Sequence, residues 1–144
     1  MRVEWAFACR YAESDGMTAT IVGAGIDTFF PAVLPSMIGF LVVVKFVAPQ
    51  EEWESERELG FTILGPDAEV VKDEESIKMK ALLGQPLFEV YERGGIVVTA
   101  HQFEVQSSGA YSLEIAIDGE NKKSVPFYIH EGPPPPAPEP DGKD

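Results

Sequence analysis

The chain has 144 residues, with 11 Lys and Arg against 24 Asp and Glu, so its formal net charge is −13. This length suits one domain with a single core, and this charge repels phosphate backbones and anionic lipid surfaces, so we expect neither nucleic acid nor membrane as a partner. Cys9 is the only cysteine and permits no internal disulfide, and the charged N-terminal residues lack the apolar core of a signal peptide. We therefore predict a cytoplasmic protein.

Regular alternation predicts the first strand. From Val3 to Tyr11, large side chains fall on one face and small or charged ones on the other, which is the period of a strand. The sequence SDG at 14–16 favours a turn, because glycine accepts positive φ and aspartate bonds the nearby backbone. We expect a hairpin whose second arm runs from Met17 to Phe29 and is interrupted by Gly23 and Gly25.

The longest apolar run is SMIGFLVVVKFVA, from Ser36 to Ala48, and its only charge is Lys45. It is shorter than the roughly 20 residues that cross a bilayer. A short run rich in β-branched residues is typical of a strand that is covered on both faces, so we predict a central strand. Alternation puts Ile38, Phe40, Val42, Val44 and Phe46 on one face, and Leu41, Val43 and Val47 on the other.

Negative charge gathers between Glu51 and Glu75, where ten acidic residues stand against Arg57 and Lys72. Within this stretch, apolar residues alternate from 59 to 63 and stop at Gly-Pro-Asp at 65–67, which predicts a strand and a turn. Residues Ser76 to Leu83 fit either a short helix or an edge strand, and we favour the strand.

Four further strands are predicted at 88–91, 96–106, 111–117 and 125–129. Arg93-Gly94-Gly95 is expected to form the turn between the first two, and DGENKK at 118–123 the loop between the last two. Pro126 donates no ladder hydrogen bond, so its strand should lie at a sheet edge or bend there.

Several pieces of the chain resemble an uncharacterised family of small β-rich bacterial proteins. They are WAFACRYAE, ATIVGAGIDTF, the VAP that ends the central strand, GAYSLEIAIDG and SVPFYI. The similarity spans about Val3 to His130 and implies a small β-rich domain. The family has no assigned activity, so the resemblance implies no catalytic or binding residue.

Short strands, frequent turns and little helical periodicity predict an all-β fold. We expect an antiparallel β-sandwich, immunoglobulin-like or C2-like. A small closed β-barrel is the alternative, because the glycines of the second arm could supply the bends that closure needs. Residues 1–131 are expected to form this one domain, and residues 132–144 a disordered, Pro-rich, acidic tail of polyproline character.

Few residues suit catalysis or a cofactor. His101 shares a face with apolar residues and is expected to pack in the core, while His130 is expected to be solvated. Cys9 follows Trp5 and Phe7 on an apolar face, where a cysteine behaves as a small hydrophobe. The Gly23-Ala24-Gly25 sequence lacks the third glycine and the helix of a dinucleotide site. We predict no catalytic residues, no cofactor and no enzyme activity.

The acidic residues raise two other hypotheses. A C2-type site for Ca²⁺ would need carboxylates from separate loops, and the weak candidates are Asp15, Asp67, Asp73 and Asp118; otherwise we expect no metal. Loops could also bind carbohydrate, since Trp53 could stack on a sugar or anchor a partner. Our main prediction is a non-catalytic module for protein binding or self-association through an acidic face or a strand edge. The candidate partner-binding residues are Glu51, Glu52, Trp53, Glu54 and Glu56.

Overall fold

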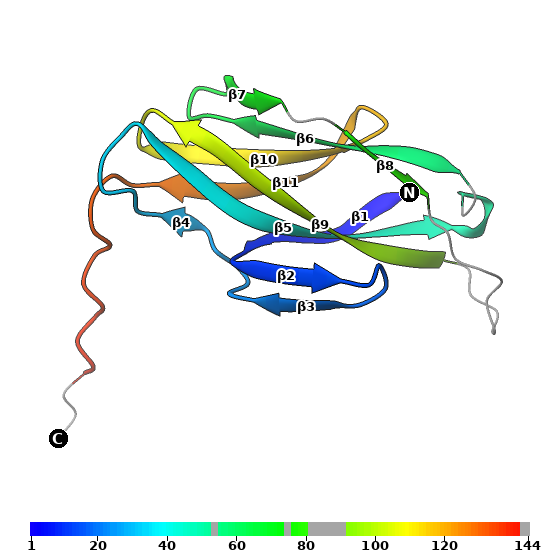
Figure 1. Cartoon of the computed structure of the whole chain (residues 1–144), viewed down its shortest axis with the longest axis horizontal. Coiled ribbons are helices and arrows are strands. Elements are labelled where there is room, and N and C mark those ends of the chain that lie inside the picture. The colour runs from blue at the N-terminus through cyan, green and yellow to red at the C-terminus, as the bar shows by residue number, and fades with distance from the viewer. Residues whose placement is uncertain (53–54, 74–75, 81–91, 142–144) are drawn as a thin grey trace.

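The computed structural model describes residues 1–52, 55–73, 76–80 and 92–141. They form an all-β sandwich with a hairpin packed on its outside, so that three layers are stacked (Figure 1). The middle layer contains β1 (Arg2–Cys9), β5 (Ser36–Pro49) and β9 (Glu92–Val105), in the order β1-β5-β9. The larger sheet has the order β4-β11-β10-β6-β7, made by β4 (Thr28–Phe29), β11 (Glu120–Ile129), β10 (Gly109–Ile117), β6 (Glu56–Leu64) and β7 (Val70–Asp73), with β8 (Ile77–Lys80) also paired to β6. The outer hairpin consists of β2 (Tyr11–Ser14) and β3 (Ala19–Val22).

The sandwich confirms the predicted fold class. Among the described residues no ladder joins the two larger sheets, so the alternative of a closed barrel is not formed. The pairings are antiparallel except for the short β4, which lies parallel to the end of β11.

The predicted central strand is confirmed as β5. It pairs antiparallel with β1 on one side and with β9 on the other, and Val42, Val43 and Val44 are all 0% exposed. Its two faces divide nearly as the alternation predicts: one faces the larger sheet, and Val43 and Leu41 face the hairpin.

The main core lies between the two larger sheets. Phenylalanine rings fill its centre: Phe40 meets Phe103 edge-on at 5.9 Å between ring centroids and Phe127 at 5.3 Å. Leu59, Phe61 and Ile63 of β6 are buried, as their alternation predicts. The large apolar area removed from water here is the main source of stability, at roughly 25 cal/mol per Å².

The β2–β3 hairpin covers the other face of β5. Its turn forms at Ser14-Asp15-Gly16 as predicted, because the Asp15 carboxylate accepts hydrogen bonds from the backbone N–H groups of Met17 (2.9 Å) and Thr18 (2.7 Å). Underneath, Cys9, Ala12 and Val43 form a second buried cluster, against which Trp5 and Phe7 pack.

The N-terminal strand departs from the predicted single apolar face. The β1–β5 register shifts between Val3 and Trp5, which is the effect of a β-bulge. Val3 therefore packs against the main core, whereas Trp5 and Phe7 pack against the hairpin cluster. Tyr11 belongs to β2 and is 50% exposed.

Three predicted turns or boundaries are wrong. Gly94 and Gly95 lie inside β9, where they pair with Val47 and Phe46 of β5. Glycine is needed there, because a Cβ on Gly94 would sit 2.2 Å from the Phe46 carbonyl oxygen and one on Gly95 would sit 2.8 Å from the Phe46 ring. The last hairpin turns at Asp118-Gly119 alone, both with positive φ, so residues 120–123 belong to β11. The second arm of the first hairpin ends at Val22, and the chain reaches Phe29 through a turn and β4.

Other expectations concern the ends of segments. The preferred strand at 76–83 is confirmed as β8 for Ile77–Lys80, and the predicted strand at 88–91 lies outside the described residues. Pro126 lies where β11 is paired on one side in the described structure, since β4 reaches only Tyr128 and Ile129. No helix in the described part of the chain has the length and apolar character needed to span a bilayer.

Val43→Asp should prevent folding. An unpaired carboxylate at this 0% exposed position costs several kcal/mol against a total stability of about 5–15 kcal/mol. Circular dichroism and thermal unfolding measure the effect. Val33→Asp is the matched control, because Val33 is 66% exposed, and its melting temperature should stay near that of the parent. A soluble, cooperatively unfolding Val43→Asp protein would contradict the placement of β5 at the centre.

Candidate functional site

One edge of β9 is open in the described structure. β9 pairs with β5 along one side for its whole length. On the other side, the Ile96 N–H donates to the Gly16 carbonyl oxygen of the hairpin turn at 2.9 Å. Because strand main-chain groups alternate, the N–H and C=O groups of Val98, Ala100 and Gln102 point the same way, away from β5.

Two contacts limit this edge at its ends. The hairpin turn covers Ile96, and the Lys72 ammonium donates to the Gln102 carbonyl oxygen at 2.6 Å from the facing sheet. Between them, the outward main-chain groups of Val98 and Ala100 make no hydrogen bond with another described residue. The open edge is therefore short and has defined limits.

A groove lies next to this edge, between β9 and β7. Its volume is about 410 Å³. Phe103 and Tyr111 supply buried aromatic surface, and Glu69, Lys72 and Glu104 supply charge. The Tyr111 hydroxyl donates to the Ser107 carbonyl oxygen at 2.7 Å, which holds the ring in place. Two carboxylates and one ammonium make the lining acidic on balance.

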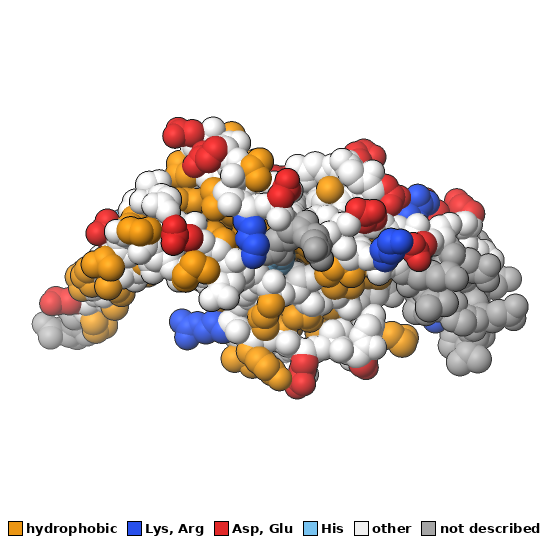
Figure 2. Space-filling model, turned by 45° about the horizontal axis from the view of Figure 1, so that its top comes forward, with side chains coloured by type: hydrophobic (Ala, Val, Ile, Leu, Met, Phe, Trp, Pro, Cys, Tyr) orange, Lys and Arg blue, Asp and Glu red, His pale blue; other side chains and the backbone are white. Residues whose placement is uncertain are grey.

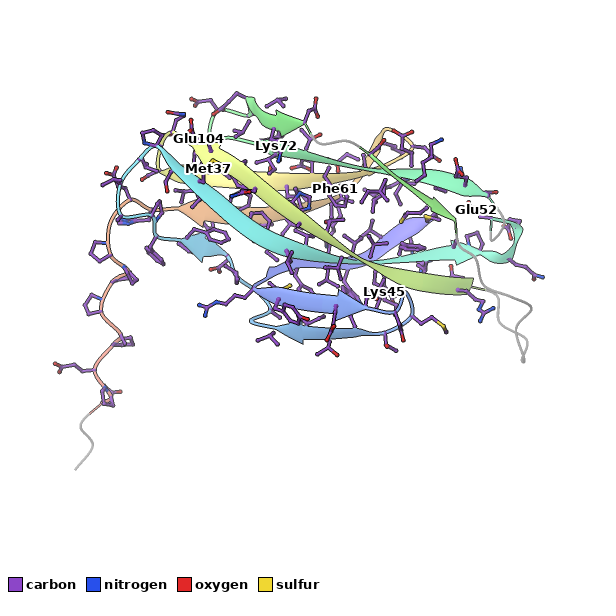
Figure 3. The ribbon with its side chains drawn as sticks, viewed as in Figure 1. Met37, Lys45, Glu52, Phe61, Lys72 and Glu104 are labelled. Atoms are coloured by element: carbon purple, nitrogen blue, oxygen red, sulfur yellow. The ribbon has the colours of Figure 1, made fainter. Side chains whose placement is uncertain are left out.

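The outer face of β5 and β9 is also exposed beyond the hairpin. Met37 pairs with Glu104 and Gly39 with Gln102, and Met37 is 53% exposed. Figure 3 shows Met37, Lys72 and Glu104 near one end of the sandwich and Glu52 at the opposite end. We call the outward main-chain groups of Val98 and Ala100, with the groove and Met37, the β9 edge site.

The predicted acidic binding residues are not a uniform free patch. Glu51 and Glu52 lie in the short 3-10 turn η1 (Gln50–Glu52), and Glu52 forms ion pairs with the Met1 ammonium and with Arg57. The hydrogen bond from the Met1 ammonium lowers the pKa of Glu52. Glu56 pairs with Lys78 at 3.5 Å. Trp53 and Glu54 lie outside the described residues.

Acidic side chains are spread over the molecule. The face in Figure 2 shows carboxylates in several separate places, with basic side chains between some of them. Among the described residues of the acidic stretch, β6, β7 and the turns place carboxylates at both ends of the sheet, while Glu54, Glu74 and Glu75 lie outside the described residues.

The four candidate Ca²⁺ ligands are held apart. Asp15 caps the β2–β3 turn, Asp67 lies in the β6–β7 turn, Asp73 accepts a hydrogen bond from Thr62 at 3.0 Å, and Asp118 binds Arg57 at 2.9 Å. Within the described residues, no group of three or more His, Cys, Asp or Glu side chains could hold a metal ion.

The histidines and the cysteine lie where packing explains them. His101 is 2% exposed and sits between Phe40 and Phe61, with its Nε2 2.7 Å from the Thr99 hydroxyl. Cys9 is 0% exposed, and burial raises the pKa of its thiol. His130 is exposed and packs against Phe30 at 5.9 Å between ring centroids.

Sequence reasoning did not identify the β9 edge site. The sequence holds one signal: Ala100, Gln102 and Glu104 alternate with residues that are buried in the structure, and they are themselves exposed. That alternation predicts a solvent-exposed face, but it does not predict that the strand lies at the edge of its sheet.

Comparisons with known proteins identify a family whose function is unknown. The model of a family described as "Family of unknown function (DUF6941)" matches residues 4–130. No curated protein matches the chain. Among solved structures, the Pseudomonas fluorescens alkylpurine DNA glycosylase AlkC bound to DNA containing an abasic site analog is similar, with 10% identity and a TM-score of 0.38. The match covers 72% of this chain and 27% of that one, and at this TM-score it carries no argument.

Asp118→Asn should destabilise the protein at neutral pH and much less in acid. The Glu58 N–H and then Arg57 lower the pKa of Asp118. Because the pKa of Asp118 is lower in the folded state, its carboxylate stabilises the folded protein at pH values above the unfolded-state pKa of about 3.9. This contribution is lost as the pH falls through the folded-state pKa. Urea unfolding at about pH 7 and about pH 3 measures it. Asp67→Asn, in an exposed turn, controls for the change in net charge. An equal effect of Asp118→Asn at both pH values would contradict the ionic contribution.

Proposed function

We infer that this chain, which belongs to a family of unknown function (DUF6941), is a non-catalytic module that binds an extended segment of another protein. The observation that carries the proposal is the β9 edge site. Its open main-chain groups lie beside a groove with aromatic and charged walls.

A bound segment would add to the middle layer as a further strand. In this mode the main-chain hydrogen bonds supply affinity, and alternate side chains supply specificity. The outward groups of Val98 and Ala100 are the bonding positions. Side chains on one face of the segment would enter the groove against Phe103 and Tyr111, while those on the other would lie near Met37.

The two ends of the site set the length of the segment. The Gly16 contact at Ile96 covers the edge on one side. Lys72 covers Gln102 on the other, and a lysine over a strand edge hinders indiscriminate pairing with other chains. At about 3.3 Å per residue of strand, a segment of about four to six residues would fit between these two contacts or would displace the Lys72 ammonium.

Charge favours a basic ligand. Glu69 and Glu104 line the groove, and the whole chain carries −13. A basic segment would be attracted to this surface, whereas a second copy of the same chain would be repelled.

Ala100→Pro should abolish binding while leaving the fold intact. Proline removes one outward N–H and places its ring on the edge, and the ladder to β5 uses the inward groups. A displayed library of random peptides, selected on the parent protein, provides the ligands. Ala100→Ser keeps the N–H and should bind as the parent does. If Ala100→Pro binds the peptides as tightly as the parent does, with unchanged circular dichroism, the proposal is contradicted.

Binding of the selected peptides should weaken as salt rises. The Debye length falls from about 10 Å at 0.1 M to about 3 Å at 1 M, which screens the attraction between the acidic groove and a basic peptide. Affinity is measured by calorimetry across this range. Glu69→Gln with Glu104→Gln should reduce both the affinity and its salt dependence. Glu139→Gln with Glu131→Gln is the matched control, because these carboxylates lie in the exposed C-terminal segment. Affinity independent of salt would contradict the basic ligand.

A further inference from the structure

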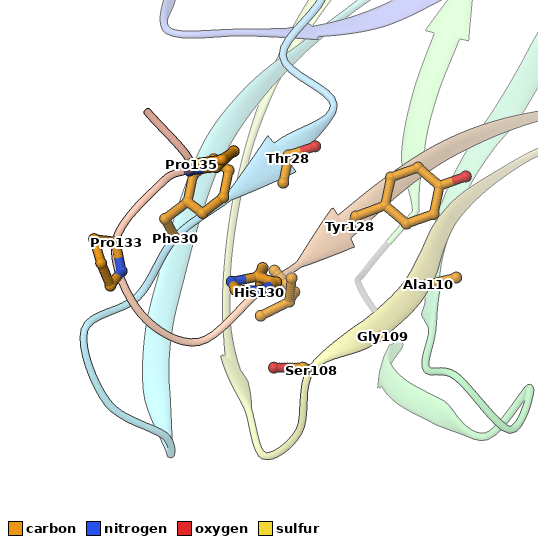
Figure 4. A pocket seen from close by; sticks show the side chains of 10 residues that line it. Thr28, Phe30, Ser108, Gly109, Ala110, Tyr128, His130, Pro133 and Pro135 are labelled. Carbon is orange, nitrogen blue, oxygen red and sulfur yellow. The ribbon is translucent and has the colours of Figure 1, made fainter. Parts of the chain in front are cut away.

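A second groove, lined by a different set of residues, lies at the same end of the sandwich as the β9 edge site, where β4, β10 and β11 meet the start of the tail. Its volume is about 700 Å³. Phe30, Tyr128 and His130 contribute rings, and Ala110 and Ile129 contribute aliphatic surface. Figure 4 shows Phe30 and Tyr128 on opposite sides, with His130 between them.

The groove is exposed and mostly apolar. Phe30 is 37% exposed and Tyr128 is 51% exposed, although both are large aromatic residues. Grooves lined with aromatic side chains are the surfaces that bind polyproline segments, because the rings stack on flat proline rings and the ligand is already extended. Pro133 and Pro135, the first prolines of the tail on this side, form part of the wall of the groove.

The base of the tail is fixed to the sandwich. Main-chain N–H groups of Tyr128, His130 and Gly132 donate to the carbonyl oxygens of Asp27, Phe29 and Pro31, at 2.7, 3.0 and 2.8 Å. The Glu131 N–H also donates to the Ser108 hydroxyl at 3.0 Å. This ladder continues the parallel pairing of β4 with β11 as far as Gly132. The tail therefore leaves the domain at the rim of the groove.

After this point the tail runs away from its own domain. Gly132 has φ of +105°, a value that glycine adopts without strain. Residues 133–141 are exposed and belong to no strand, and Figure 1 shows them extending outward from the sandwich. The tail therefore lines its own groove only at its first prolines and leaves the rest of it open.

We propose that the groove between Phe30 and Tyr128 binds the Pro-rich tail of a second copy of this chain. Beyond the prolines that line its own groove, the segment from Pro136 to Pro140, PAPEP, has the chemistry that such a groove accepts. In polyproline geometry these five residues extend about 15 Å, at about 3.1 Å per residue. That length is sufficient to cross to a neighbouring molecule and occupy its groove.

The placement of tail and groove leads to a closed dimer. Each molecule donates its tail from the rim of the same groove that accepts its partner's tail. Two copies related by a two-fold axis can therefore exchange tails reciprocally, and both grooves are then filled. The exchange needs no residue of the β9 edge site, so it goes beyond the proposed function and is independent of it.

Salt distinguishes this association from peptide binding at β9. Each copy carries −13, so two copies repel each other at low ionic strength, and the contact that joins them is mainly apolar. Screening removes the repulsion. The dimer should therefore become stronger as salt rises, in contrast to the binding of a basic segment.

Sedimentation equilibrium of the full chain tests the proposal, from about 10 μM to about 1 mM, the range in which weak contacts of this size associate. We expect the mass to rise from 15.8 kDa toward twice that value, more completely at high salt. Tyr128→Ser should shift the dissociation constant at least tenfold, and so should replacement of Pro136, Pro138 and Pro140 by serine. Tyr11→Ser is the matched control, since Tyr11 is 50% exposed on the outer hairpin, and it should associate as the parent does.

Two further measurements separate the alternatives. A synthetic peptide of residues 133–144, added in excess, should dissociate the dimer, and Ala100→Pro should leave the dimer unchanged. A chain that stays monomeric throughout overturns the proposal. A dimer that survives Tyr128→Ser or the proline replacements also overturns it, as does a dimer lost in Ala100→Pro. Peptide binding by a chain that remains monomeric would show a proline site without exchange between copies, which equally contradicts it.

Discussion

The structure depends on covering β5 from both sides. Val42, Val43 and Val44 are consecutive and all 0% exposed, so neither face of the strand can meet water. A two-layer sandwich buries only one face of each sheet. The third layer, the β2–β3 hairpin, covers Val43 and Leu41 on the outer face of β5. The need to bury these side chains explains why so short a hairpin packs on the outside of the sandwich.

The same arrangement leaves the β9 edge site uncovered. The hairpin is shorter than β5 and β9, each of which has 14 residues, so it shields their outer face only around Leu41 and Val43 of β5 and Ile96 and Val98 of β9. Beyond it, Met37 and Ala100 are exposed. On the facing sheet β7 is only four residues long and reaches β9 through Lys72. The open edge thus follows from the unequal lengths of neighbouring elements.

The strands were largely predictable from the sequence, and their relations in space were not. Alternation identified β5, β6 and β10 because each has a consistently buried face. Gly94 and Gly95 were predicted to form a turn, but glycine is typical both of a turn and of a close backbone approach, and only the position of Phe46 decides between them. The ion pairs of the acidic stretch were not predictable for a similar reason: Glu52 pairs with the Met1 ammonium and Glu56 with Lys78, and both partners come from other segments of the chain. Neither proposed site was predictable, because each depends on which surfaces the described elements leave uncovered, and the sequence does not show how those elements are placed in space.

The position of Cys9 makes the third layer measurable. Its thiol is the only one in the chain and is completely covered in the cluster beneath the hairpin. A thiol reagent reaches it only when the hairpin lifts or the whole domain unfolds, since both the burial and the raised pKa suppress reaction in the closed state. Its labelling rate under native conditions therefore reports the local opening free energy of this layer. A rate faster than global unfolding would identify the hairpin as a separately opening unit of the fold.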